Sequence, residues 1–201
     1  MNLFSQKKQD FKLPNAEIIY APNFFKKELA DHYFDRINTE TDWQHNDITV
    51  FGKTYKEPRL TALYSETDQP YGYSNLIMYP KPFTNILKGI KSKVEAFSDY
   101  NFNTLLINLY RNGSDSNGWH ADNERELGVN PIIASVSFGA ERPFHFKHRA
   151  IKEERHKLIL EHGSLLIMKG EMQHHWLHQI AKTKKQVAPR INLTFRQLIT
   201  I

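Results

Sequence analysis

The C-terminal half of the chain is built from short segments in which apolar and polar side chains alternate, with turn residues between them. Alternation with a period of two is typical of β-strands that bury one face. The connections are too short for the crossover helices that parallel strands need. These segments therefore predict an antiparallel sandwich, jelly roll or barrel. The expected strands are residues 104–111, 132–139, 143–149, 157–161, 164–168, 174–180 and 190–198.

The N-terminal half mixes helices with a few strands. Apolar residues at helical spacing predict helices over 22–38 and 80–98, with Pro82 in the first turn of the second. We expect both helices to lie against the sheet, which makes the fold mainly β with flanking helices (α+β). Residues 1–16 are polar and irregular and predict an N-terminal tail, and no linker divides residues 17–201, which predicts a single domain. Further strands are expected at 17–20, at 58–64 and as a pair within 43–55.

Composition limits the chemistry that is possible. The chain has no cysteine, so a metal ion would be held by carboxylates and by some of the ten histidines. No apolar run is long enough to span a bilayer, and the N-terminus lacks the apolar segment of a signal peptide. We therefore expect no membrane partner and a cytoplasmic location, nucleoid-associated in a bacterium or nuclear in a eukaryote. The net charge of +5 permits a polyanionic partner such as nucleic acid.

A candidate metal site begins with His120 and Asp122, which are two residues apart. On an extended segment such residues point to the same side, so an imidazole nitrogen and a carboxylate oxygen could meet at one point. That pair is two thirds of the 2-His-1-carboxylate triad that binds non-haem iron(II). The third ligand would come from a distant strand, and the candidates are His174, His175 and His178.

The segment 190–196 carries a second candidate site. Its apolar residues face the core, and its other face presents Arg190, Asn192, Thr194 and Arg196. A buried guanidinium needs a carboxylate, so a dicarboxylic acid cosubstrate is a natural ligand for this face. Asn108 and Tyr110 alternate in the same manner and could complete the pocket. Without the histidines and the aspartate, a strand with a solvated outer face would be the preferred explanation of the pattern.

Taken together, these motifs resemble the AlkB family of iron(II)- and 2-oxoglutarate-dependent dioxygenases. The similarity covers about residues 45–198, and the order and spacing of its blocks are more specific than any single block. The matching blocks are residues 108–110, 120–126, 133–139, 162–165, 175–178 and 189–196. Residues 50–53, 58–59 and 71–74 are most similar to the members that repair alkylated DNA.

The resemblance implies a role for each candidate residue and a double-stranded β-helix (jelly-roll) core over about residues 103–199. His120, Asp122 and His178 would bind Fe(II), and O2 would take an open position on the iron. Arg196 would pair with the distal carboxylate of 2-oxoglutarate. The rest of the cosubstrate pocket would be formed by Arg190, Asn192, Thr194, Asn108 and Tyr110.

The resemblance also implies a nucleotide-recognition lid over about residues 45–78. Tyr71 and Tyr73 would belong to this lid, although their spacing alone fits simple packing on a sheet, and Phe51 would approach the duplex as a wedge. Asn123 stands where relatives often carry an acidic residue that contacts the base. The full set expected to contact the substrate is Phe51, Gly52, Lys53, Arg59, Tyr71, Gly72, Tyr73, Asn123 and Glu124.

The activity implied is oxidative demethylation of N-alkylated bases, such as 1-methyladenine and 3-methylcytosine, in DNA. A monomer is expected. Two basic segments, 182–185 and 147–149, could contact the phosphate backbone. The same chemistry on RNA or protein is an alternative, as is a non-catalytic jelly roll that binds nucleic acid. A zinc hydrolase would leave the arginine-bearing strand unexplained.

Overall fold

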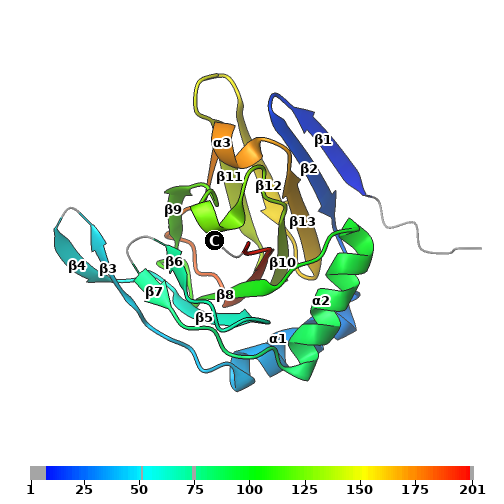
Figure 1. Cartoon of the computed structure of the whole chain (residues 1–201), viewed down its shortest axis with the longest axis vertical. Helices are drawn as coiled ribbons and strands as arrows, with labels where there is room; N and C mark the ends of the chain where they lie inside the picture. The colour runs from blue at the N-terminus through cyan, green and yellow to red at the C-terminus, as the bar shows by residue number, and fades with distance from the viewer. Residues whose placement is uncertain (1–7, 51, 74–75, 200–201) are drawn as a thin grey trace, which may run out of the picture.

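Two antiparallel sheets form the body of the protein in the computed structural model, which describes residues 8–50, 52–73 and 76–199 (Figure 1). Residues of both sheets share one apolar cluster, in which Leu106 and Leu166 of the larger sheet meet Phe144, Phe146 and Trp176 of the smaller. The larger sheet has the order β1 (Gln9–Leu13), β2 (Ala16–Ala21), β13 (Ser164–Lys169), β10 (Ile133–Gly139), β15 (Arg190–Arg196), β8 (Thr104–Tyr110) and β5 (Leu60–Ser65). The smaller has the order β12 (Arg155–Leu160), β11 (Arg142–His148), β14 (Trp176–Ile180) and β9 (Asn117–His120).

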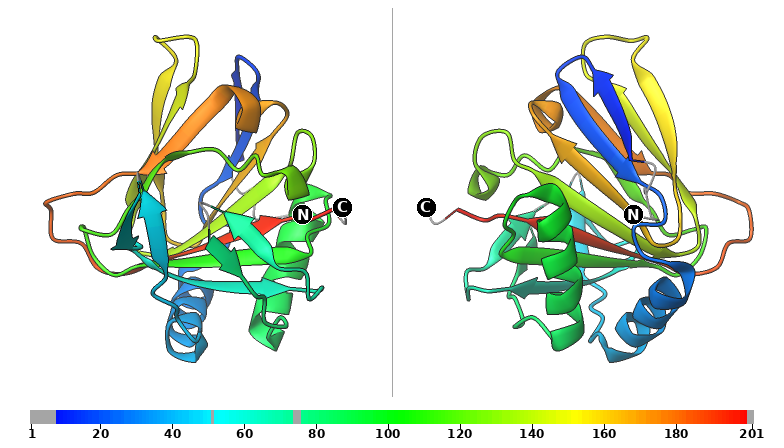
Figure 2. Two further views of the ribbon diagram at one scale, coloured as in Figure 1. Left: turned by 60° about the vertical axis from the view of Figure 1, so that its left-hand side comes forward. Right: turned by 90° about the vertical axis from the view of Figure 1, so that its right-hand side faces the viewer.

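The two long helices cover the outer face of the larger sheet, as Figures 1 and 2 show. They are α1 (Lys27–Glu40) and α2 (Asn85–Ser98). The apolar stripe of α2, formed by Leu87, Ile90 and Val94, joins the same core cluster as Leu105 and Ile107 of β8. The larger sheet therefore has apolar side chains on both faces, which explains why every residue of β8 is buried. The remaining short helices are η1 (Arg125–Leu127) and α3 (Met172–His175).

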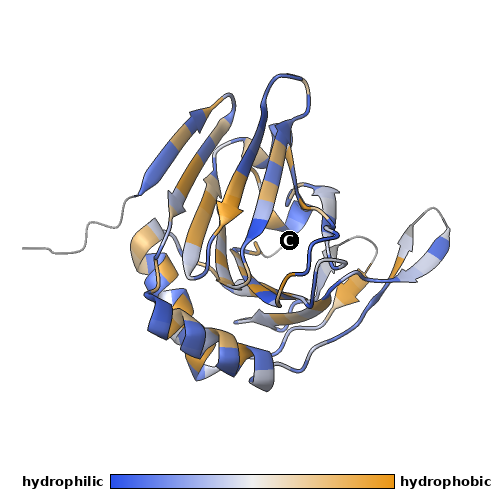
Figure 3. Cartoon of the chain, turned by 180° about the vertical axis from the view of Figure 1, so that it is seen from behind, coloured by the Kyte–Doolittle hydropathy of each residue, from blue (hydrophilic) through white to orange (hydrophobic). Residues whose placement is uncertain are grey.

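Two hairpins lie outside the sandwich and occupy the region expected to form the lid. They are β3 (Asp47–Val50) with β4 (Lys53–Lys56), and β6 (Tyr71–Tyr73) with β7 (Leu76–Met78). In Figure 1 the first extends away from the body and the second is next to β9. The mainly β jelly roll with flanking helices is thus confirmed, and in Figure 3 apolar and polar bands alternate along its strands. No helix in the described ranges is long and apolar enough to cross a membrane.

Three expectations about local structure were wrong. The segment 9–13 is not part of an irregular tail, because it pairs with β2 through a tight turn in which Asn15 has a φ of 55°. Both long helices begin later than expected, α1 at Lys27 rather than at residue 22 and α2 at Asn85 rather than at residue 80. In α2, Thr84 caps the helix and the residue before Pro82 is kept extended. His174 and His175 lie in α3 rather than in a strand. Residues 1–7 lie outside the described part of the chain, and a single domain over 17–201 stays a prediction.

Candidate metal centre and cosubstrate cavity

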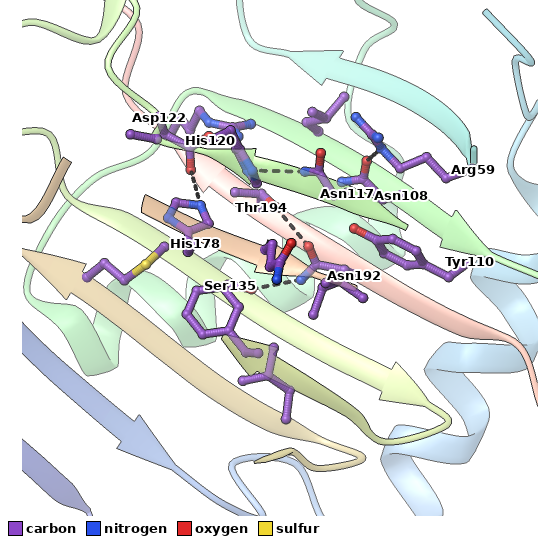
Figure 4. Close-up of a pocket in the computed structure, with 18 of the residues that line it drawn as sticks. Arg59, Asn108, Tyr110, Asn117, His120, Asp122, Ser135, His178, Asn192 and Thr194 are labelled. Atoms are coloured by element: carbon purple, nitrogen blue, oxygen red, sulfur yellow. Dashed lines mark hydrogen bonds and ion pairs between the residues drawn. The ribbon is translucent and has the colours of Figure 1, made fainter. Parts of the chain in front are cut away.

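His120, Asp122 and His178 converge at the inner face of the smaller sheet. His120 is the last residue of β9 and pairs directly with His178 of β14, so both imidazoles point into the sandwich. Asp122 follows two residues later and enters the same space (Figure 4). One ligand atom from each of the three residues lies within 4.8 Å of the others. Within the described part of the chain, the group of three or more neighbouring His, Cys, Asp or Glu side chains that could hold a metal ion is this one.

Hydrogen bonds orient these side chains toward a common point. The Nδ1–H of His120 donates to the carbonyl oxygen of Gly118 at 2.7 Å, which directs Nε2 inward. The amide nitrogen of Asn117 lies 3.1 Å from that Nε2. Gln173 accepts a hydrogen bond from the backbone N–H of Asp122 at 2.9 Å and holds the segment that follows β9. Partners of this kind fix the tautomer and position of metal-binding residues.

The ionisation of the three groups suits a divalent cation. Burial lowers the pKa of His120, and burial together with His120 lowers the pKa of His178 to about 3. Burial alone would raise the pKa of Asp122, but Arg196 and the two imidazoles outweigh it and hold that pKa well below its usual range. At neutral pH the site therefore offers two neutral imidazoles and one carboxylate. Those are the donors of an iron(II) facial triad.

We expect the metal-free protein to lose stability as the pH falls below about 6.5, the unperturbed pKa of histidine. The unfolded chain then binds a proton at His178, whereas the folded chain, with a pKa of about 3, does not. The contribution of His178 to the free energy of unfolding is fully present above about pH 6.5. It falls by up to about 1.4 kcal/mol per pH unit as the medium becomes more acidic. Urea unfolding at several pH values measures the slope. His178→Gln should flatten it and the exposed His174→Gln should not; equal slopes in all three proteins would contradict this account.

The polar face of β15 points into a cavity beside the triad, with β8 and β10 on its two sides. Asn192 lies opposite Asn108 of β8 and Ser137 of β10. Its amide donates to the Ser135 hydroxyl at 2.7 Å, and its carbonyl accepts from Thr194 at 3.1 Å. The cavity has a volume of about 140 Å³ and reaches the metal site. Its polar lining includes Arg59, Asn108, Tyr110, Asn117, His120, Asp122, Glu124, Ser135, His178, Asn192, Thr194, Arg190 and Arg196.

The two arginines of β15 stand at opposite ends of this cavity and have different partners. Arg196 donates from Nη2 to Oδ1 of Asp122 at 2.8 Å, so its charge is already balanced. Arg190 is buried over the ring of Tyr110, with its guanidinium 5.2 Å from the ring centroid. Its Nη2 donates to the Ser137 hydroxyl at 2.9 Å, while Nε and Nη1 have no hydrogen-bond partner among the described residues.

The expected pairing of Arg196 with a distal carboxylate stays a prediction, and the contacts that are present favour Arg190 for that role. Arg196 is paired with Asp122, whereas Arg190 has no ion-pair partner in the described part of the chain. Burial lowers the pKa of Arg190 to about 10, so it remains a cation at neutral pH. A buried, uncompensated guanidinium is costly unless an anion joins it. The residues present thus fit a ligand with one carboxylate at Arg190 and a second polar end at the metal site.

Comparisons with known proteins agree with this geometry. Residues 17–196 match the model of the 2OG-Fe(II) oxygenase superfamily. The DNA oxidative demethylase ALKBH2 of Homo sapiens is 39% identical over 188 residues, which are 87% of this chain and 71% of that protein. The chain belongs to the AlkB family.

Two further relatives define how far the AlkB similarity extends. The alpha-ketoglutarate-dependent dioxygenase alkB homolog 3 of Homo sapiens is 41% identical over 190 residues, which are 90% of this chain and 66% of that protein. The chain therefore spans just under two thirds of that relative's length. A solved structure of OsALKBH1 superposes with a TM-score of 0.67 at 18% identity and covers 94% of this chain and 99% of that one. At that identity the likeness supports the AlkB fold alone.

The residues expected to contact an AlkB substrate are divided by the structure into two groups. Tyr71 and Glu124 line the cavity, where burial raises the pKa of each. Arg59 lines it too, but its guanidinium is bound to Glu57 at 2.7 Å and to Asn108 at 2.8 Å, so it holds the wall in place. Asn123 is exposed and does not line the cavity, whereas its neighbours Asp122 and Glu124 both do.

The other expected substrate residues lie on the two hairpins. Gly52 occupies the turn between β3 and β4 with a φ of 74°, and Lys53 is exposed on β4. Gly72 and the backbone of Tyr73 belong to β6. Phe51 lies outside the described residues. Their contact with a substrate stays a prediction.

Sequence patterns had not singled out several residues that shape the site. Ser135 and Ser137 alternate with apolar neighbours on β10 in the same manner as the polar residues of β15, so this signal was available. Gln173 lies in α3, far from Asp122 along the chain, and nothing in its local pattern indicates that it binds there.

Proposed function

We propose that the protein is an Fe(II)- and 2-oxoglutarate-dependent dioxygenase that removes N-alkyl groups from nucleobases in DNA. One observation carries this proposal: the buried donor set of two neutral imidazoles and one carboxylate shares a cavity with the uncompensated guanidinium of Arg190. A 2-oxo diacid fits both ends of such a cavity, and the family match supports the same cosubstrate.

His120, Asp122 and His178 would hold the iron, with Nε2 of each histidine turned toward it. Arg190 and Tyr110 would receive the distal carboxylate of 2-oxoglutarate, and Asn108, Asn192 and Thr194 would line its chain. When bound, the iron and the cosubstrate activate O2, and hydroxylation of the N-methyl group lets it leave as formaldehyde while succinate and carbon dioxide form. The protein supplies position and a site shielded from water.

The substrate base would enter from the side of Tyr71 and Glu124. A base inside a duplex cannot reach the cavity, so it must be extruded, which costs least for a lesion that pairs poorly. Methylation at N1 of adenine or N3 of cytosine blocks pairing and leaves the base cationic. The carboxyl group of Glu124, which lines the cavity near Asp122, would complement such a base.

The test measures formaldehyde and succinate released by the purified protein with Fe(II), ascorbate and 2-oxoglutarate. The substrates are single- and double-stranded DNA containing 1-methyladenine or 3-methylcytosine, with methylated RNA alongside and His120→Ala as the control. We expect release that requires methylated DNA and vanishes in the variant. Release with RNA alone would move the substrate to RNA, and no turnover with iron verified as bound would leave a non-catalytic binding module.

The loop between β14 and β15 carries exposed Lys184 and Lys185 close to the pocket strand. This loop is fixed in place, because the backbone N–H of Thr183 donates to the carbonyl of Gly113 at 2.8 Å and any Cβ at Gly113 would lie 2.5 Å from the Thr183 oxygen. In the second basic segment, 147–149, the ring of His148 is buried and accepts backbone hydrogen bonds, so it does not face solvent.

Removing both charges by Lys184→Ala and Lys185→Ala should weaken DNA binding and flatten its dependence on salt. For every phosphate that the protein no longer neutralises, the slope of log K against log[salt] should become shallower by about 0.7 to 0.9. Filter binding over a range of salt concentrations gives this slope. An unchanged slope would rule out phosphate contacts by this loop.

A further inference from the structure

Trp119 is the residue immediately before His120, yet its side chain lies on the opposite face of β9. The register of β9 and β14 directs His120 and His178 inward, so their neighbours Trp119 and Leu177 face outward. Trp119 remains 40% exposed. The ammonium group of Lys147 lies 4.3 Å from the centre of its ring, which places Lys147 on the same outer face. This cation–aromatic pair lies on the other face of β9 from the metal site, although Trp119 is the neighbour of His120 in the chain.

Strand register shows that the pair is one end of a longer row of side chains. Lys147 of β11 is paired with Leu177 on one side and with Arg155 of β12 on the other. The next outward row contains Lys157, His145 and Gln179. Every charged side chain in these two rows is a cation, and Arg155 and Lys157 are exposed. Neighbouring strands are about 4.8 Å apart, so the row crosses roughly 14 Å from β9 to β12. The hairpin of β11 and β12, yellow in Figure 2, extends this face beyond the body.

This combination has the chemistry of a surface for single-stranded nucleic acid. Proteins that bind single strands join a cationic track, which follows the phosphates, to an exposed aromatic ring on which a base stacks. Trp119, which remains exposed beside this cationic row, offers such a ring face. Trp119 belongs to β9, the edge strand of the smaller sheet, and precedes the triad residue His120. In Figure 1 the hairpin of β6 and β7 is drawn next to β9.

We propose that the strand flanking the extruded nucleotide crosses β9 and runs over the outer face of the smaller sheet. A neighbouring base stacks on Trp119, and Lys147 and Arg155 contact phosphates. This inference rests on the proposed function and adds to it a path for the strand. It requires the flanking bases to be unpaired, because a ring cannot stack on a base that is held within a duplex. It also predicts that lengthening the oligonucleotide on one side of the lesion increases affinity more than lengthening it on the other.

The test follows binding of a 3-methylcytosine oligonucleotide to the metal-free protein by anisotropy and by tryptophan fluorescence. Trp176 is buried, and Trp43 packs against the apolar cluster between the larger sheet and the two long helices (the helix-side core). Quenching of tryptophan fluorescence by a stacked base therefore reports mainly on Trp119. Trp119→Ala should weaken binding by about tenfold, within the range measured for base–aromatic stacking. Trp119→Phe should retain most of the affinity and lose most of the quenching.

Two lysine variants complete the experiment. In Lys147→Ala, the slope of log K against log[salt] should become shallower by the amount expected for one phosphate contact. Lys93→Ala is the matched control, because Lys93 also lies over an aromatic ring, 5.5 Å from its centroid, but on the helical side of the protein. It should change neither the affinity nor the salt slope.

The outcomes separate this inference from the proposed function. If the wild-type protein turns over methylated DNA and Trp119→Ala binds it with an affinity within twofold of wild type, the proposed strand path is wrong and the proposed enzymatic activity stands. Quenching that persists in Trp119→Phe, or equally strong quenching by a fully paired duplex, would also overturn it. If Trp119→Ala loses affinity but the wild-type protein shows no turnover, the proposed nucleic-acid-binding surface stands and the proposed activity is wrong.

Discussion

Replacing Arg190 with Met should raise the KM for 2-oxoglutarate by about 100-fold without lowering the stability of the ligand-free protein. The loss follows because a charge-assisted pair in a buried site is worth several kcal/mol when one partner is removed. Stability should be unchanged or higher, because the guanidinium has no ion-pair partner among the described residues until a ligand arrives. Steady-state kinetics and thermal unfolding in the absence of the cosubstrate measure the two effects.

The same variant should lose the stabilisation that 2-oxoglutarate gives to the wild-type protein. A ligand that binds only the folded state raises the unfolding temperature with its concentration, so an unchanged shift in Arg190→Met would place the carboxylate elsewhere. Arg142 supplies the contrast: it is also buried, but donates to the carbonyl oxygens of Asn112, Asp115 and Ala181. Arg142→Met should therefore lower stability and leave the response to 2-oxoglutarate in place. Arg190→Lys keeps the charge but loses the planar fork and should be intermediate.

The alternation in 190–196 was sufficient to predict which residues of that strand face the cavity. Ile191, Leu193 and Phe195 do pack in the helix-side core, and the four polar residues do line the cavity. Alternation could not predict which arginine lies at the metal end of the cavity and which at the Tyr110 end, because both arginines occupy the same face of the strand. That choice depends on Asp122, whose position is set by the turn after β9 and by Gln173 of α3. Such long-range contacts leave no periodic signal in the local sequence.

The same limit explains the other differences. Polar composition suggested a tail at 9–13, but Pro14 and Asn15 form the turn that folds β1 back on β2, and a Pro-Asn pair is a recognisable turn signal. The family resemblance implied that Tyr71 and Arg59 contact the substrate, although the spacing of Tyr71 and Tyr73 alone fitted packing on a sheet. Both are buried in the structure, and Arg59 is neutralised by Glu57. Sequence pattern predicts which face a residue occupies more readily than which partner it meets there.

Replacing Asp122 with Ala should abolish turnover and also destabilise the metal-free protein by about 3 kcal/mol, because it leaves the Arg196 charge buried without its partner. Adding Arg196→Met should restore most of that stability, since replacing both members of a buried ion pair by apolar groups is often neutral. It should restore no activity, because the carboxylate ligand is still missing. Urea unfolding and formaldehyde release distinguish the two effects, and a double variant as unstable as Asp122→Ala would show that the unbalanced charge is not the cause.

Arg196→Met alone completes the cycle and should affect the metal site through protonation. Arg196 holds the pKa of Asp122 low, so without it burial raises that pKa and the carboxylate takes up a proton more readily as the pH falls. Metal affinity should then decrease toward acidic pH in Arg196→Met, under conditions in which the wild-type protein keeps its metal. Titration with Fe(II) or Mn(II) at neutral and mildly acidic pH measures this difference. Parallel pH profiles for both proteins would mean that Arg196 positions Asp122 without setting its charge.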